Sequence, residues 1–165
     1  MRTALRWMMG GVIVTGCVYA GAVGATPASQ FIGTTVAVGH FGEFDVNLHT
    51  IPADIWHSQQ RTNGQSDMYV QSNVWQPGGT TGWHSHPGHS LIIVTAGTVT
   101  DYESDDTTCT PHVYTVGQGF VDKGGDHVHM IRNEGSVEAR TYAVQLIPAG
   151  ATRRIDAAAP GNCPF

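Results

Sequence analysis

The sequence predicts an all-β fold, built as one antiparallel sandwich or barrel, and three observations support this prediction. Glycine and proline are abundant, with 21 and 8 of the 165 residues, whereas charged residues make up only 13%. This composition suits short strands joined by tight turns. The apolar segments are also short, and several alternate with polar residues as strands do. Finally, a chain of this length has room for one domain with a buried core.

Six segments show the strand pattern, and turn-forming sequences separate most of them. In chain order, we expect strands within residues 34–41, 67–76, 90–102, 111–121, 127–133 and 137–147. Residues 52–62 are the one stretch that could instead form two or three helical turns. Strands at this spacing, without intervening helices, indicate an antiparallel β architecture.

Residues 1–25 have the features of a secretion signal. Arg2 and Arg6 precede an apolar run that ends in small residues, and no acidic side chain occurs there. We expect cleavage after Ala25 and a secreted or extracytoplasmic location. Two alternatives stay open: a membrane anchor, for which the run is short and broken by glycine, and a lipoprotein whose lipidated residue is Cys17 in the sequence VTGC.

The charge of the mature chain limits its partners. Removing the predicted signal lowers the count of lysine and arginine from 8 to 6 against 13 acidic residues, so the formal net charge changes from −5 to −7. A surface this acidic repels phosphate backbones, which argues against nucleic acid as a partner. We expect a small-molecule ligand and no membrane span, and a homodimer is one open option for the oligomeric state.

Cys109 and Cys163 are the two cysteines that remain after removal of the signal. In an oxidising compartment such an even pair predicts a disulfide. This bond would pin the C-terminal tail, residues 149–165, to the middle of the domain. Two separate free thiols are the alternative, and in either case no third thiol is left for metal binding.

Histidines gather in two short segments. The sequence GWHSHPGHS carries His84, His86 and His89, and DHVHMIRN carries His127 and His129. Residues two apart on a strand point to the same side, so His84 and His86 can converge on one point. Either His-x-His pair alone could be a polar pair on a rim. Two such pairs on different strands of a small β domain indicate a transition-metal site.

At these residues the chain resembles the cupin superfamily, and the likeness covers roughly residues 66–148. Gly78, His84, His86 and Gly97 look like the first cupin motif. That motif reads glycine, five residues, His-x-His, three or four residues, glutamate, six residues and glycine.

The sequence GQGFVDKGGDHVHMIRN resembles the second cupin motif, which ends here in His129 and Asn133. The resemblance implies a single-domain antiparallel jelly-roll β-barrel. It also implies that His84, His86 and His129 bind one divalent transition metal inside the barrel. Residues 26–65 would then supply N-terminal strands and a connecting segment.

The chain departs from the family pattern at two places. Ser90 stands where the family has its glutamate ligand, and Lys123 and Gly124 stand where its second motif has proline. The expected site is therefore three neutral imidazoles plus water, which leaves the metal charge uncancelled. His89 and His127 are the candidates for a fourth ligand.

The expected ligand set permits more than one function. Imidazoles suit iron, zinc, manganese, nickel or copper, so they do not select the metal. Iron would permit a dioxygenase acting on a small molecule, and zinc would favour Lewis-acid chemistry. A non-catalytic secreted module that binds a metal or a small ligand is the alternative, because fold alone does not fix function. Four residues on strands that could reach the barrel are open candidates for a general base: Tyr102, Glu103, Tyr142 and Gln145.

Overall fold

A computed structural model describes residues 24–52 and 55–165, and all regular structure in these ranges is β-strand. The strands are β1 (Ser29–Phe41), β2 (Asp45–His49), β3 (His57–Arg61), β4 (Ser66–Thr80), β5 (His84–Ser85), β6 (Ser90–Ala96), β7 (Thr98–Glu103), β8 (His112–Thr115), β9 (Gly119–Asp122), β10 (His129–Arg132), β11 (Ala139–Pro148) and β12 (Ile155–Asp156). The all-β prediction is confirmed. The predicted signal up to residue 23, with Cys17, lies outside the described residues.

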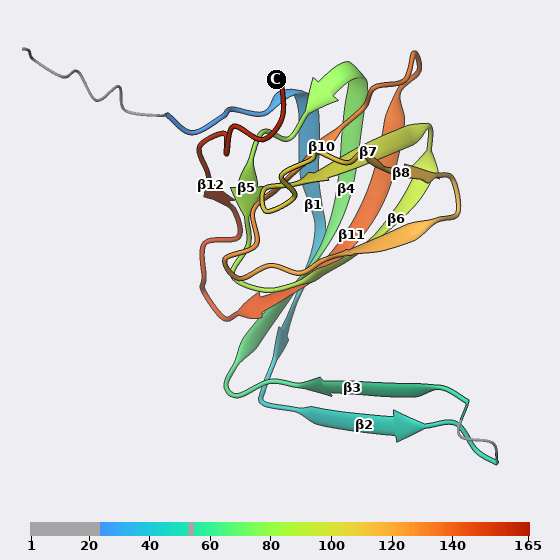
Figure 1. Cartoon of the computed structure of the whole chain (residues 1–165). Helices are drawn as coiled ribbons and strands as arrows, with labels where there is room; N and C mark the ends of the chain where they lie inside the picture. The colour runs from blue at the N-terminus through green and yellow to red at the C-terminus, as the bar shows by residue number, and fades with distance from the viewer. Residues whose placement is uncertain (1–23, 53–54) are drawn as a thin grey trace, which may run out of the picture.

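Ten of these strands form one antiparallel sheet that curls into a nearly closed barrel (Figure 1). Strand β4 lies between β1 and β11, and β11 pairs with β6, which pairs with β9. On the other side of the barrel, β10 pairs with β4, β5 and β7, and β7 pairs with β8. This is the jelly-roll arrangement that the sequence predicts. Within the described ranges, the structure contains no apolar helix of the length needed to cross a bilayer.

Strand alternation decides which side chains face the inside of the barrel. On β6, Ser90, Ile92 and Val94 are buried, whereas Leu91 and Ile93 between them are exposed on the outer surface. A strand with one buried face alternates in this way because successive side chains point to opposite sides. The inward positions of β6 are therefore one polar residue followed by two apolar ones.

Apolar side chains form two separate clusters. The larger contains Trp75, Ile92, Val94, Val99, Phe120, Ile131, Ala139 and Ala143. The smaller contains Trp83, Tyr102 and Met130, with Cys109, Val128, Ala157, Ala159 and Cys163 packed against it. The barrel thus has its main apolar core in one region and a second cluster where the C-terminal tail covers the β7 and β10 side.

Strands β2 and β3, residues 45–49 and 57–61, form a hairpin arm that extends away from the barrel (Figure 1). They pair in one continuous register, from Asp45 opposite Arg61 to His49 opposite His57. The helix suggested within residues 52–62 is wrong at residues 57–61, which form the strand β3. Its sequence HSQQR has no apolar stripe to bury against the barrel as a helix would require, and pairing with β2 satisfies its backbone instead.

The C-terminal tail is held to the barrel by a disulfide and by backbone pairing. The structure joins Cys109 to Cys163, which are 54 residues apart. Strand β12 pairs with β5, so that Asp156 lies opposite His84. Near the end of the tail, the Asn162 side-chain amide donates hydrogen bonds to the carbonyls of Glu103 and Asp106. The tail is therefore a structural part of the barrel wall.

We predict that replacing both cysteines by serine lowers the free energy of unfolding by about 4 kcal/mol, the chain-entropy value for a loop of this length. Urea unfolding followed by tryptophan fluorescence measures the loss. Dithiothreitol should reduce the stability of the parent to the same degree and leave the double variant unchanged. An unfolding midpoint equal to that of the oxidised parent would show that the bond contributes nothing.

Candidate metal centre

Three histidines from two neighbouring strands meet inside the barrel. His84 lies on the two-residue strand β5, His86 follows that strand, and His129 opens β10 directly opposite His84 in the register. Each offers one ring nitrogen, and these three atoms lie within 4.8 Å of one another. His84 and His129 are almost fully buried, and His86 is partly exposed toward the cavity. The two predicted His-x-His segments thus contribute to one cluster.

The opposite nitrogen of each ring is fixed by a hydrogen-bond acceptor. Nδ1 of His84 forms a hydrogen bond with the Gly82 carbonyl at 2.9 Å. Nδ1 of His86 forms one with the Arg153 carbonyl at 2.5 Å. Nδ1 of His129 bonds the Asp101 carboxylate at 3.0 Å. Carbonyls and carboxylates accept only, so each Nδ1 carries the hydrogen and each neutral ring has its lone pair on Nε2. Metal-binding histidines are oriented in this way.

Burial and neighbouring charges set the protonation of these rings. Burial lowers the pKa of His84 well below its usual value, and the nearby His129, Arg154 and His86 lower it further. Burial also lowers the pKa of His86, although the Asp122 carboxylate opposes it. For His129 burial again lowers the pKa, but the hydrogen bond with Asp101 and the charges of Asp101, Asp122 and Glu103 together raise it, and the net shift is upward. Two of the three rings are therefore kept neutral at neutral pH, as metal binding requires.

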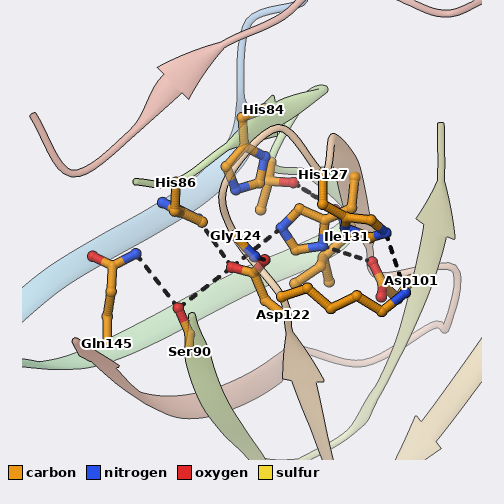
Figure 2. Close-up of polar contacts among 12 residues, drawn as sticks. His84, His86, Ser90, Asp101, Asp122, Gly124, His127, Ile131 and Gln145 are labelled. Carbon is orange, nitrogen blue, oxygen red and sulfur yellow. Dashed lines mark hydrogen bonds and ion pairs between the residues drawn. The ribbon is translucent and has the colours of Figure 1, made fainter. Parts of the chain in front are cut away.

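Asp122 is a fourth polar residue at this point, and it is not among the ligands predicted from the sequence. Its side chain is 1% exposed, and its Oδ2 lies 3.4 Å from His86 Nε2 and 3.7 Å from His129 Nε2 (Figure 2). The Ser90 hydroxyl donates to Oδ2 at 3.3 Å. One signal in the sequence could have revealed it: in the β9 sequence GFVD, Asp122 shares the strand face of the apolar Phe120 and so points inward.

A cavity of about 230 Å³ opens beside the histidines. Besides the histidines, its polar lining includes Thr81, Ser90 and Asp122, and from β4, β11 and the tail Gln71, Asn73, Gln145, Arg153 and Arg154. Arg153 donates from Nε to Gln145 at 3.1 Å and from one terminal nitrogen to Thr35 at 3.0 Å. Its apolar lining includes Trp75 and Ile131. The cavity therefore combines a histidine cluster, amides and a guanidinium group.

The two other candidate ligands lie elsewhere. His89 contacts Gln60 of the hairpin arm, with the two Nε2 atoms 3.4 Å apart. His127 directs Nε2 at the Glu103 carboxylate, 2.6 Å away. His127, Glu103 and the exposed Asp105 form a separate group of potential ligands. The structure therefore brings neither His89 nor His127 into the three-histidine cluster.

The four candidates for a general base also separate. Only Gln145 lines the cavity, and its amide donates to Ser90 at 3.4 Å (Figure 2). The Tyr102 hydroxyl donates to Glu134, and Tyr142 is 48% exposed on the outer face of β11. Glu103 faces His127. Of these side chains, the one that reaches the cavity is an amide, which is not a base near neutral pH.

The chain is similar to one protein family and to several solved structures. A family model described as a cupin domain matches residues 73–145. Similar solved structures include a cupin domain from Bordetella pertussis Tohama I, with 16% identity, coverage of 64% of this chain and 93% of that chain, and a TM-score of 0.42. Another is a conserved protein from Klebsiella pneumoniae with a double-stranded β-helix domain, with 20% identity, coverage of 56% and 70%, and a TM-score of 0.45.

An oxalate oxidase is also similar in structure, with 22% identity, coverage of 50% of this chain and 46% of the oxidase, and a TM-score of 0.42. The match thus spans about half the length of that enzyme. No curated protein matches the chain.

In the loop between β9 and β10, Gly124 packs against Gly88, which lies in the first histidine segment. Gly124 has φ of +66°, and its amide donates to Asp122 Oδ1 at 3.0 Å. An added Cβ would lie 2.1 Å from the Gly88 carbonyl oxygen. Gly125 has a similar φ of +70°, but nothing lies within 4 Å of its Cβ position. Glycine at 124 is therefore required by contact as well as by conformation.

We predict that Gly124→Ala destabilises the protein far more than Gly125→Ala. Both variants carry the strain of a left-handed alanine, about 1 to 2 kcal/mol, but the first also forces two backbone segments apart. Urea midpoints of the purified variants measure the difference, which should exceed about 2 kcal/mol. Equal losses would mean that Gly124 does not pack against Gly88.

Proposed function

This chain belongs to the cupin superfamily through residues 73–145, and we propose that it binds one divalent transition metal beside a cavity for a small molecule. His84, His86 and His129 are the proposed ligands. The observation that carries this proposal is the orientation of the three rings. Each gives its Nδ1 hydrogen to a fixed acceptor, so three Nε2 lone pairs face one point.

The residues fit a metal in one further respect. His129 Nε2 is buried and has no hydrogen-bond partner in the described part of the chain. A buried polar atom without a partner is costly, and a bound cation satisfies it. When bound, a divalent metal would act as a Lewis acid for a ligand in the cavity.

We propose that the ligand is small, polar and anionic. Drug-sized ligands occupy pockets of about 300 to 1,000 Å³, so a cavity of about 230 Å³ suits a smaller molecule. Arg153 would attract an anion, since its guanidinium borders the cavity while donating to Gln145 and Thr35. The amides of Gln71 and Asn73 offer neutral hydrogen bonds on the β4 side.

The reaction we favour is oxidation by molecular oxygen with iron as the metal. Non-haem iron keeps open coordination positions beside its protein ligands, and a site that faces a cavity lets a small molecule reach them, whereas structural zinc sites are closed by four protein ligands. The chain's own residues would position the anion against the site and exclude water from it. The alternative is a non-catalytic binding module, which the absence of Tyr102 and Glu103 from the cavity lining favours.

Oxygen consumption distinguishes the two functions. The purified protein is stripped of metal, reloaded with Fe²⁺ or Zn²⁺, and supplied with a panel of small carboxylates. Oxygen uptake only with iron and one class of carboxylate supports the enzyme. Tight metal and carboxylate binding without turnover supports the module.

We also propose export of the mature chain, in which residues 26–65, 66–148 and 149–165 would be the N-terminal strands, cupin core and pinned tail. The disulfide between Cys109 and Cys163 suits an oxidising compartment. Thr26, the first residue after the proposed cleavage, bonds the tail at Ala157.

We predict that alanine at position 84, 86 or 129 lowers the affinity for Zn²⁺ by more than about 100-fold, because each variant loses a ligand and outer contacts alone contribute about 10- to 100-fold. Isothermal titration with the metal-free protein measures this. His89→Ala and His127→Ala serve as matched controls and should stay within about threefold of the parent. A pattern in which the controls lose metal and the other three retain it would refute the ligand assignment.

We predict a smaller effect for Asp101→Asn, which replaces the acceptor that orients His129. An asparagine can present its NH₂ group to the ring and favour the wrong tautomer, so the affinity for Zn²⁺ should fall about 10- to 100-fold. Asp126→Asn, an exposed change of equal charge on the loop before β10, should leave the affinity unchanged. If the two variants bind alike, Asp101 does not position the ring.

A further inference from the structure

We propose that Asp122 is a fourth ligand of the ion, supplying from β9 the carboxylate that Ser90 cannot supply from β6. This inference rests on the proposed function, since it concerns the same ion. It assigns the centre three nitrogen donors and one oxygen donor, in place of the three imidazoles and water expected from the sequence.

When both rings are neutral, hydrogen-bond acceptors face one another between Asp122 and the two histidines. Its Oδ2 lies 3.4 Å from His86 Nε2 and 3.7 Å from His129 Nε2. Both rings hold their hydrogen on Nδ1, where Arg153 and Asp101 accept it. With neutral rings, a carboxylate oxygen meets two ring lone pairs in a buried space, which is unfavourable unless a cation lies between them.

The separations fit donors that share one ion. Metal bonds of about 2.0 to 2.2 Å to nitrogen and oxygen place neighbouring donor atoms about 3.0 to 3.5 Å apart. The separation of 3.4 Å from His86 lies within this range, and the separation of 3.7 Å from His129 needs only a slight closure to reach it. They exceed the usual N–H···O hydrogen-bond length of about 2.9 Å.

The charge at the site also calls for a divalent cation. Asp101 and Asp122 are both buried, and they flank His129 from two sides. Among the described residues, the ion pairs of Asp122 involve only the two histidines. A buried carboxylate without a cationic partner is strongly disfavoured. With neutral imidazoles, two carboxylates carry a formal charge of −2, which one divalent ion balances.

The place of Asp122 in the sheet explains how it could replace a ligand on another strand. Ser90 and Asp122 are register partners across β6 and β9, and their side chains are joined by the 3.3 Å hydrogen bond. The Gly124 amide fixes the second carboxylate oxygen at 3.0 Å. One oxygen is thus anchored by the loop while the other is directed at the histidines (Figure 2).

The test compares Asp122→Asn with the full-length mature parent, using Zn²⁺ for affinity and Co²⁺ for its visible absorption. Loss of a ligand should lower the affinity for Zn²⁺ by about 100-fold or more and change the Co²⁺ absorption bands. Asp126→Asn, an exposed change of equal charge on the same loop, is the matched control and should alter neither property.

Stability gives a second measurement that requires no metal. An asparagine NH₂ group can donate to a ring nitrogen, so the metal-free Asp122→Asn variant should unfold at a higher urea concentration than the metal-free parent. Saturating Zn²⁺ should reverse this order. If the single variant does not fold, Ser90→Glu combined with Asp122→Ser moves the carboxylate to the neighbouring strand and should keep Zn²⁺ affinity within about tenfold of the parent.

The outcomes separate this inference from the proposed function. Suppose that the parent binds Zn²⁺ and that His84→Ala does not. If Asp122→Asn then has the Zn²⁺ affinity and the Co²⁺ bands of the parent, or if the exchanged pair loses more than about tenfold in affinity, only the fourth ligand is wrong. If the parent itself binds no metal, the proposed function fails, and the fourth ligand fails with it.

Discussion

The site depends on one constraint, which is that three buried imidazoles each donate their Nδ1 hydrogen to an acceptor fixed by the fold. Two of these acceptors are main-chain carbonyls, at Gly82 and Arg153, so the backbone itself selects the tautomer. The third is the buried Asp101 carboxylate on β7, which adds charge as well as direction. Because free rotation of any ring would scatter the Nε2 lone pairs, these contacts would preorganise the proposed metal centre.

This constraint connects the centre to the C-terminal tail. Arg153 provides a carbonyl to His86 and a guanidinium to the cavity, and both come from the segment just before β12. Strand β12 in turn covers β5, which carries His84. The bond between Cys109 and Cys163 closes this segment against the second apolar cluster. A disulfide at the edge of the barrel therefore limits the motion of residues that line the centre.

The polar interior also determines where apolar burial is possible. Asn73 and Gln145 occupy inward positions that an ordinary core would fill with aliphatic side chains, and both are buried and hydrogen-bonded. Apolar packing is concentrated instead around Trp75 and around Trp83. Buried polar groups are tolerated when their partners are in place, and such networks hold side chains in one arrangement. The barrel thus combines stability in its two clusters with a preformed polar cavity.

The sequence by itself determined the class of fold, because turn residues and short alternating segments are local properties that each strand carries in its own residues. It also indicated that His84, His86 and His129 lie together, and the structure places them in one cluster. The first two are two residues apart and so share a strand face, and the third belongs to a second motif that is continuous in sequence. Tertiary structure decided the rest. The helix suggested for residues 52–62 gave way at β3 to pairing with β2.

Which further side chains join the histidines was likewise decided only by the fold. His89 and His127 are nearest in sequence to the three histidines, yet they turn toward Gln60 and Glu103. Asp122 comes from another strand and meets them through the register of β6 with β9. Alternation indicates that a side chain points inward, but the neighbour across the sheet depends on strand pairing and barrel closure, which are long-range properties that local sequence does not encode.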